Sequence, residues 1–230
     1  MADPHKTACN HSSPSPFITR MKRPQFLILA GLLLVASCSN AAEERRVASM
    51  VQPDASVASF MVCHGSGCRI HSETGLTDEE WSKIEEAFDP PAATAEAERK
   101  QIARAIGLFE LYVGPKTNTK SDAGRNRPDV DQATQLDCID ETVNTTTYLH
   151  LIEAAGLLRW HSVGLPAHRT EGLINFHNTA VVVEQSDGTM WAVDSWFGPN
   201  ASPPAIVPLD AWRAGWQPGR SIPTVASASP

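Results

Sequence analysis

Three residues of this chain have types and spacing that suit thiol chemistry. Cys138 opens a segment with helical periodicity, His177 begins an expected strand, and Asp194 ends the next expected strand. A thiol can act as a nucleophile, an imidazole can act as its base, and a carboxylate can fix the orientation of the ring. The order Cys, His, Asp therefore predicts a nucleophilic site, provided that the intervening elements bring the three side chains together.

The expected helix begins at Cys138 and runs to Ala155. Apolar residues recur on one broad face of this segment, among them Val143, Tyr148 and Ile152, which is typical of a helix that packs on a core. A thiol at a helix N-terminus faces unpaired N–H groups and the positive end of the helix dipole, and both lower its pKa. We therefore expect a thiolate at neutral pH.

Three strands are expected after this helix, over residues 158–163, 179–184 and 190–193. Asp187-Gly188 lies between the last two and is typical of a two-residue hairpin turn. The run of three valines at 181–183 lacks alternation, which indicates a strand covered on both faces.

The expected hairpin sets the distance between the base and the carboxylate. A two-residue turn places Asp194 opposite Val181, four residues along the strand from His177. A bulge, or a bend at Asn178, must close this gap. Otherwise Asn175 or Asn178 orients the imidazole, or the three residues form no triad.

Further helices and connecting segments are expected on both sides of this region. A capping box at 77–80 opens a helix that runs to Phe88, and a second helix covers 94–113, where Gly114-Pro115 ends it. Residues 115–131 form a polar loop, residues 210–216 form a last helical turn, and 217–230 form a disordered tail.

The N-terminus carries an export signal. Met21-Lys22-Arg23 is followed by an apolar run over 26–35 and then by small residues. Val35-Ala36-Ser37-Cys38 resembles a bacterial lipobox, which implies cleavage before Cys38, acylation of its sulfur and firm attachment to a membrane. Residues 1–20 precede Met21, an alternative start. The other interpretation is an ordinary cleaved signal with an unrelated Cys38.

The residues after the signal indicate a tethered protein of the cell envelope. Ser39, in place of Asp, implies the periplasmic face of the outer membrane in such lipoproteins, and residues 39–58 read as a tether to the domain at 59–216. The formal net charge of the chain is −7. Because Lys and Arg form no cluster after the signal, a nucleic-acid partner is not expected.

Cys63 and Cys68 flank a glycine-rich loop, and the oxidising periplasm favours a disulfide between them. Two alternatives remain: a zinc site completed by His64 and His71, or two unpaired thiols. A redox role for the pair is a further interpretation, although Cys-x-x-x-x-Cys is not the usual redox spacing. A disulfide here leaves Cys138 as a single thiol within the domain.

Several of these segments resemble one known superfamily. Asp137-Cys138-Ile139-Asp140, the strand that begins at His177 and Trp191-Ala192-Val193-Asp194 resemble the transglutaminase-like cysteine peptidases, which share a papain-like core. The similarity covers residues 130–197. It implies an α+β fold with the nucleophile helix packed on an antiparallel sheet, and it assigns Cys138 as nucleophile, His177 as base and Asp194 as orienting acid. Residues 193–198 are similar to arylamine acetyltransferases, which share this order.

The resemblance also bears on the oxyanion hole and on cofactors. The backbone N–H of Cys138 is one expected donor, and Gln132 or Gln135 is a candidate for the second. Some bacterial members bind calcium through acids on both sides of the cysteine. Asp137 matches one of these acids, whereas Ile139 replaces the other, so we expect no cofactor.

The sequence therefore predicts a lipid-anchored periplasmic cysteine hydrolase or acyl-transfer enzyme. Its expected substrates are amide bonds of peptides or cell-wall peptides, and its expected partners are the membrane and that substrate. The alternative is a non-catalytic binding or scaffold lipoprotein that keeps the fold. The other histidines of the domain region, His150, His161 and His168, are interpreted as structural or exposed.

Overall fold

A computed structural model describes residues 41–126, 133–171 and 175–222. The chain divides into two units, Met1–Cys38 and Ser39–Pro230, and all the described residues belong to the second. The expected signal region, with Cys38, lies outside the described residues. None of the helices in the described part has the length and apolar character needed to cross a membrane.

The larger sheet is antiparallel and has the order β3-β5-β6-β7, with β4 also paired to β5. Its strands are β3 (His161–Val163), β4 (Ala167–Glu171), β5 (Asn175–Glu184), β6 (Met190–Asp194) and β7 (Ala205–Pro208). Because β4 and β3 pair with different halves of β5, β5 is the strand that joins the whole sheet. A separate hairpin pairs β1 (Phe60–His64) with β2 (Ile70–Thr74).

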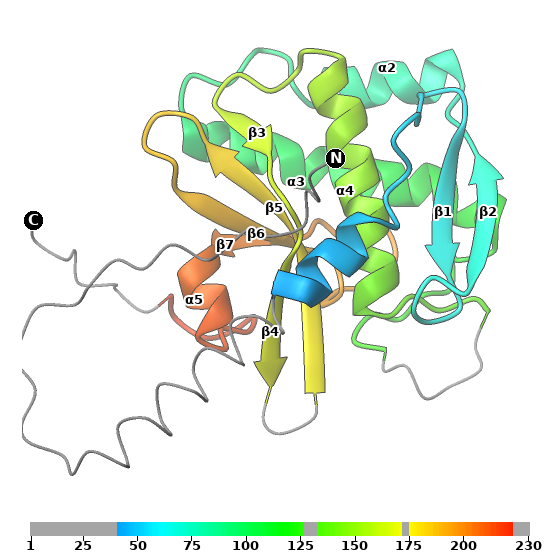
Figure 1. Cartoon of the computed structure of the whole chain (residues 1–230). Coiled ribbons are helices and arrows are strands. Elements are labelled where there is room, and N and C mark those ends of the chain that lie inside the picture. The colour runs from blue at the N-terminus through cyan, green and yellow to red at the C-terminus, as the bar shows by residue number, and fades with distance from the viewer. Residues whose placement is uncertain (1–40, 127–132, 172–174, 223–230) are drawn as a thin grey trace, which may run out of the picture. The chain divides into compact units, whose positions relative to one another are not determined.

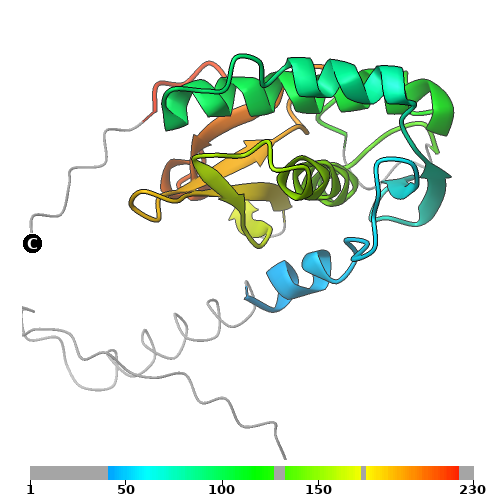
Figure 2. The ribbon, with the colours of Figure 1, turned by 90° about the horizontal axis from the view of Figure 1, so that it is seen from above.

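Four labelled helices complete the domain: α2 (Asp78–Glu86), α3 (Ala95–Thr117), α4 (Cys138–Ala154) and α5 (Leu209–Arg213). Figure 1 shows α4 between the β1–β2 hairpin and the larger sheet. Seen from above, α3 runs along one side of this arrangement (Figure 2). The architecture is therefore α+β, as predicted, with α4 packed on an antiparallel sheet.

Aromatic side chains from three elements form the centre of the main core. The rings of Phe109 in α3 and Tyr148 in α4 stack with centroids 4.6 Å apart, and Phe60 of β1 meets both edge-on. All three side chains are buried. Rings packed in offset and edge-to-face geometry add to the free energy gained from burial, so this cluster fixes α4 between the hairpin and α3.

Helix α4 forms despite a sequence rich in β-branched residues, which lower helix propensity. The hydroxyls of Thr142, Thr146 and Thr147 each donate to the carbonyl four residues earlier, at 2.6 to 2.9 Å. Thr145 instead meets the Ser195 hydroxyl at 2.9 Å. Because these hydroxyls all have partners, the helix can be buried on nearly every side.

The starts of the helices agree closely with the predicted ones, whereas two ends differ: α2 ends at Glu86 rather than at Phe88, and α3 runs beyond its predicted end. The capping box of α2 and the start of α4 at Cys138 are as predicted. Helix α3 continues past Pro115 to Thr117, and Asn118 caps it in a left-handed conformation. Pro115 lies in the last turn, so the predicted end at Val113 is four residues early.

Several strands and one packed segment were not anticipated. Strands β1, β2, β4 and β7 are short, and their sequences lack a clear alternation. Residues 41–48 are helical, and Val47 is fully buried. Gln52 accepts a hydrogen bond from the Met61 N–H at 2.8 Å. Much of the segment expected to be a tether therefore packs against the domain.

Candidate functional site

The structure brings two of the three predicted residues into direct contact. Nε2 of His177 lies 2.7 Å from Oδ2 of Asp194, and both side chains are buried. If Nε2 carries the proton that this bond requires, Nδ1 remains free to accept one. The pair thus has the geometry of an imidazole oriented by a carboxylate.

Cys138 approaches the same strand from the head of α4. Its sulfur lies 3.7 Å from the carbonyl oxygen of Phe176. The backbone N–H and the side chain of Asn178 also act on the sulfur, and both lower the pKa of the thiol. Because Phe176 and Asn178 flank His177, the sulfur contacts β5 at the residues on either side of the expected base, and the contacts described for the sulfur are to these two neighbours, not to the imidazole.

A longer turn than predicted closes the gap between His177 and Asp194. The loop covers residues 185–188, and Glu184 N–H donates to the Thr189 carbonyl at 2.8 Å. Val193 consequently pairs with Ala180, so Asp194 comes two residues nearer to His177 than a two-residue turn allows. The prediction of a two-residue hairpin, and of a bulge to compensate for it, is wrong.

Two hydrogen bonds, one within the turn and one to a residue distant in sequence, stabilise this longer turn. Gly188 has φ +77° and its N–H donates to the Glu184 carbonyl at 2.9 Å. The Gln185 N–H donates to the carbonyl of Trp160, at 2.8 Å, rather than to β6. Since Trp160 directly precedes β3, the register of the hairpin depends on a neighbour distant in sequence.

Three aromatic rings surround the His177 imidazole. The centroids of Trp196, Trp212 and Phe197 lie 4.6, 5.4 and 5.6 Å from that of the imidazole. Nε1 of Trp212 donates to Oδ2 of Asp194 at 2.6 Å, the same oxygen that His177 contacts. The rings exclude water from the pair, which strengthens the electrostatic interaction between imidazole and carboxylate.

The thiol differs from the expectation of a thiolate at neutral pH. Burial, followed by the Asp137 carboxylate, raises the pKa of Cys138 to about 12. Asp137 is the N-cap of α4, and its carboxylate accepts from the N–H groups of Ile139 and Asp140. The cap thus occupies donors that were expected to favour the thiolate and adds a negative charge beside it, so the thiol needs a base.

Of the two glutamines proposed as oxyanion donors, only Gln135 belongs to the described residues. Gln132 lies outside the described residues. The Gln135 side chain is hydrogen-bonded to the loop of residues 121–126. Its Oε1 accepts from Ala123 N–H and Asn126 Nδ2, and its Nε2 donates to the Ser121 carbonyl. Its amide is therefore fully engaged away from Cys138.

Asn178 is a polar residue that contacts the Cys138 sulfur, a role that the sequence did not predict for it. Its Oδ1 lies 3.2 Å from Nδ1 of His168. Its Nδ2 is buried and has no hydrogen-bond partner among the described residues, apart from the interaction that lowers the pKa of the Cys138 thiol. Asp194, not Asn178, orients His177, and the side chain of Asn175 is not among those described. The available signal was an amide directly after the candidate base.

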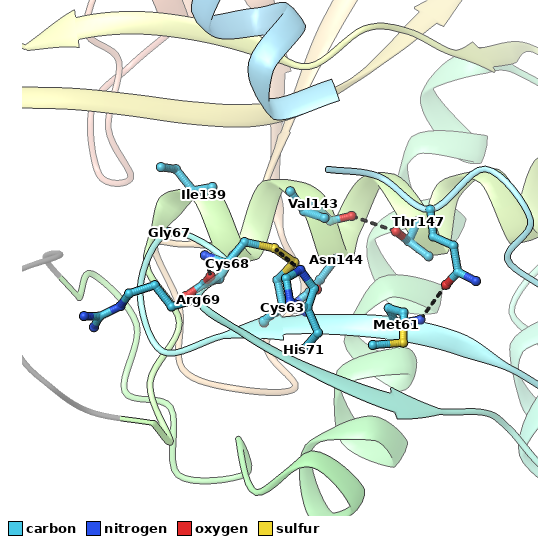
Figure 3. Close-up of a disulfide and its surroundings, with 12 residues drawn as sticks. Met61, Cys63, Gly67, Cys68, Arg69, His71, Ile139, Val143, Asn144 and Thr147 are labelled. Atoms are coloured by element: carbon cyan, nitrogen blue, oxygen red, sulfur yellow. Dashed lines mark hydrogen bonds between the residues drawn. A yellow bond between two sulfur atoms is a disulfide. The ribbon is translucent and has the colours of Figure 1, made fainter. Parts of the chain in front are cut away.

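Cys63 and Cys68 form the predicted disulfide. Figure 3 shows it between the hairpin and α4, beside Ile139 and Val143. Nε2 of His71 lies 3.6 Å from the Cys68 sulfur. Cys63, Cys68 and His71 are, among the described residues, the one group whose side chains have the spacing of metal ligands. The disulfide commits both sulfurs.

Two further residues were candidate metal ligands, His64 for zinc and Asp137 for calcium, and the side chains of both already have hydrogen-bond partners. Both His64 ring nitrogens have partners, the Ala133 carbonyl at 2.6 Å and the Ser72 hydroxyl at 2.8 Å. Asp137, the acid that matched the calcium pattern, accepts three backbone N–H groups, from Ile139, Asp140 and Gly67. His64 therefore supports β2 and the loop before α4, and Asp137 supports the start of α4.

The remaining histidines have structural contacts. His161 is buried and its Nδ1 lies 2.9 Å from Glu98, whose carboxylate also accepts from the N–H groups of residues 159–161. His150 is half-exposed, 3.4 Å from Glu153. His168 is buried and its ring lies within hydrogen-bond distance of the Asn178 side chain.

Comparison with family models, curated proteins and solved structures finds no significant match to this chain.

Proposed function

We propose that this protein is a cysteine hydrolase or acyl-transfer enzyme with a papain-like, transglutaminase-like core that acts on amide bonds. The observation that carries the proposal is the buried His177–Asp194 pair, with the Cys138 sulfur on β5 beside it. A water-excluded imidazole that is held by a carboxylate next to a lone thiol is the arrangement that nucleophilic catalysis requires.

The raised thiol pKa defines how the first step proceeds. Cys138 is a neutral thiol at rest, so its proton passes to Nδ1 of His177 as the sulfur attacks the amide carbon. The oxygen of the tetrahedral intermediate needs hydrogen-bond donors, and the backbone N–H of Cys138 is one candidate. Asp194 stabilises the imidazolium that forms.

The intermediate then collapses to products in two stages. The carbon–nitrogen bond breaks, His177 returns the proton to the leaving amine, and a thioester on Cys138 remains. Water or an acceptor amine attacks this thioester and releases the thiol, which gives hydrolysis or transfer respectively. The substrate class that we propose is peptide or cell-wall peptide, reached by a protein that a lipid on Cys38 anchors in the periplasm.

The test is hydrolysis of peptides and cell-wall peptide fragments by the purified chain, followed by mass spectrometry of the products. Cys138→Ala should abolish cleavage, and His177→Ala should lower it by at least a hundredfold. His150→Ala is the matched control, because His150 is half-exposed and far along α4 from Cys138. Equal cleavage by wild type and Cys138→Ala would contradict the proposal.

A further inference from the structure

The loop closed by the Cys63–Cys68 disulfide has an unusual backbone. Gly65, Ser66, Gly67 and Cys68 all have positive φ, at 77°, 67°, 66° and 61°. Two of these residues carry side chains, which disfavour the left-handed conformation. A loop of this kind persists only where its surroundings hold it in place.

The N–H groups of this loop converge on the segment that leads into α4. Gly65 donates to the Gln135 carbonyl at 3.3 Å. Ser66 and Cys68 donate to the two carboxylate oxygens of Asp140, at 2.9 and 2.6 Å. Successive backbone N–H groups that point into one concavity form an anion-binding nest, and here the bound anion is a side chain of the nucleophile helix.

The nest holds both carboxylates that flank Cys138 in the capping box. Gly67 N–H donates to Oδ2 of Asp137 at 2.8 Å, while Asp140 also accepts from Asp137 N–H at 3.1 Å. Burial and the neighbouring Asp137 raise the pKa of Asp140 to about 7, and the N–H groups of Cys68 and Ser66 oppose that rise. The loop thus offsets two negative charges at the head of α4.

Two further contacts fix the loop itself. Asn144, in the second turn of α4, bonds both backbone groups of Cys63, at 2.7 and 2.9 Å. On the other side, Arg69 donates to the Gly65 carbonyl at 2.8 Å. The disulfide therefore closes a ring whose start lies beside Asn144 (Figure 3) and whose interior contacts the first turn of α4 through Asp140.

We infer that this ring is a clamp that positions Cys138, that Asp140 is a positioning residue, and that the reactivity of the thiol depends on the Cys63–Cys68 bond. The claim about reactivity rests on the proposed function. Reduction by a dithiol transfers two electrons and two protons to the ring sulfurs, leaves two thiols, and converts the reductant to its own disulfide. The strained loop then relaxes, and the first turn of α4 loses its nest.

The clamp is tested first by amide hydrogen exchange in the full chain, because this readout does not depend on catalysis. Cys63→Ser/Cys68→Ser opens the ring without adding reactive thiols. Exchange in residues 137–143 should become at least tenfold faster, while residues 148–154 of the same helix stay protected. Unchanged exchange in 137–143 overturns the clamp.

Asp140→Asn keeps the disulfide and tests the clamp even if the ring-opened variant fails to fold. It replaces one carboxylate oxygen by an NH₂ group, so exchange in 137–143 should accelerate with the ring intact. Glu79→Gln is the matched control, because Glu79 is an exposed first-turn acid of α2. No difference between Asp140→Asn and wild type overturns the inference.

The reactivity claim is tested by alkylation of Cys138 with iodoacetamide, quantified on the peptide that contains it. With the ring closed, His177→Ala should slow alkylation at least tenfold; with the ring open, the same substitution should change it less than twofold. A large His177 effect that survives ring opening overturns the claim. A missing effect in the closed-ring protein overturns the proposed catalysis and the claim together, while the exchange result for the clamp stands by itself.

Discussion

Asp194→Asn isolates the charge of the carboxylate that orients His177. Asp194 is 2% exposed, and its Oδ2 accepts both the His177 bond at 2.7 Å and the Trp212 bond at 2.6 Å. An asparagine whose carbonyl oxygen takes this place keeps both hydrogen bonds and loses the charge. The substitution should therefore leave the packing intact and lower the basicity of the imidazole.

The magnitude follows from the difference between charged and neutral hydrogen bonds. A bond to a charged group contributes about 1.5–3 kcal/mol and a neutral one about 0.5–1.5 kcal/mol, so the imidazolium loses about 1–2 kcal/mol of stabilisation. Since about 1.4 kcal/mol corresponds to a factor of ten, proton transfer from the thiol should become about 5- to 30-fold less favourable. Asp194 also raises the thiol pKa directly, as a minor cause behind burial and Asp137, which offsets part of this loss.

The assay is alkylation of Cys138 by iodoacetamide at pH 7, quantified by mass spectrometry, with the melting temperature measured in parallel. We expect Asp194→Asn to react about tenfold more slowly than wild type. Asp187→Asn is the matched control, an exposed acid in the turn between β5 and β6. Faster alkylation in Asp194→Asn would refute the reasoning, because it would mean that the carboxylate only repels a thiolate and that His177 takes no proton.

Three other predictions concern the titration of buried groups. The rate of Cys138 alkylation in His177→Ala should keep rising with pH above 9, since the thiol pKa is raised to about 12; a plateau near pH 7 would contradict this. Asn178→Ala removes an amide that lowers this pKa, so alkylation at pH 7 should slow by about three- to tenfold, and an unchanged rate would count against its role. Burial raises the pKa of Glu110 from 4.5 to about 8, so its contribution to stability is present below about pH 4.5 and is lost as pH rises to about 8, at up to about 1.4 kcal/mol per pH unit. Glu110→Gln should therefore melt at a higher temperature than wild type at pH 8 and flatten the dependence of stability on pH. If wild type and variant lose the same free energy of unfolding between pH 5 and pH 8 in denaturant titrations, the prediction is wrong.

The sequence predicted those structural features that depend on residues close together along the chain. The capping box at Thr77 acts within four residues and could be read directly, whereas the start at Cys138 was predicted from the apolar pattern and its capping box at Asp137 was not. The disulfide closes a short loop, so the spacing of Cys63 and Cys68 together with the expected export favoured it over a zinc site or two unpaired thiols, and the structure has the disulfide. The end of α3 was less predictable, because a left-handed Asn118 stops the helix in place of the expected Gly-Pro pair.

The sequence by itself determined which groups are available for chemistry: one unpaired thiol at a helix start in the domain, an imidazole on a strand and a carboxylate at the end of the next. Only the tertiary structure decided their states and distances. A hydrogen bond from Gln185 to Trp160 helps to set the register that joins Asp194 to His177, and burial with the Asp137 cap makes Cys138 a neutral thiol. Both effects depend on neighbours brought close by folding, and neither the dielectric surroundings of a side chain nor its partners across a sheet can be read from its own segment.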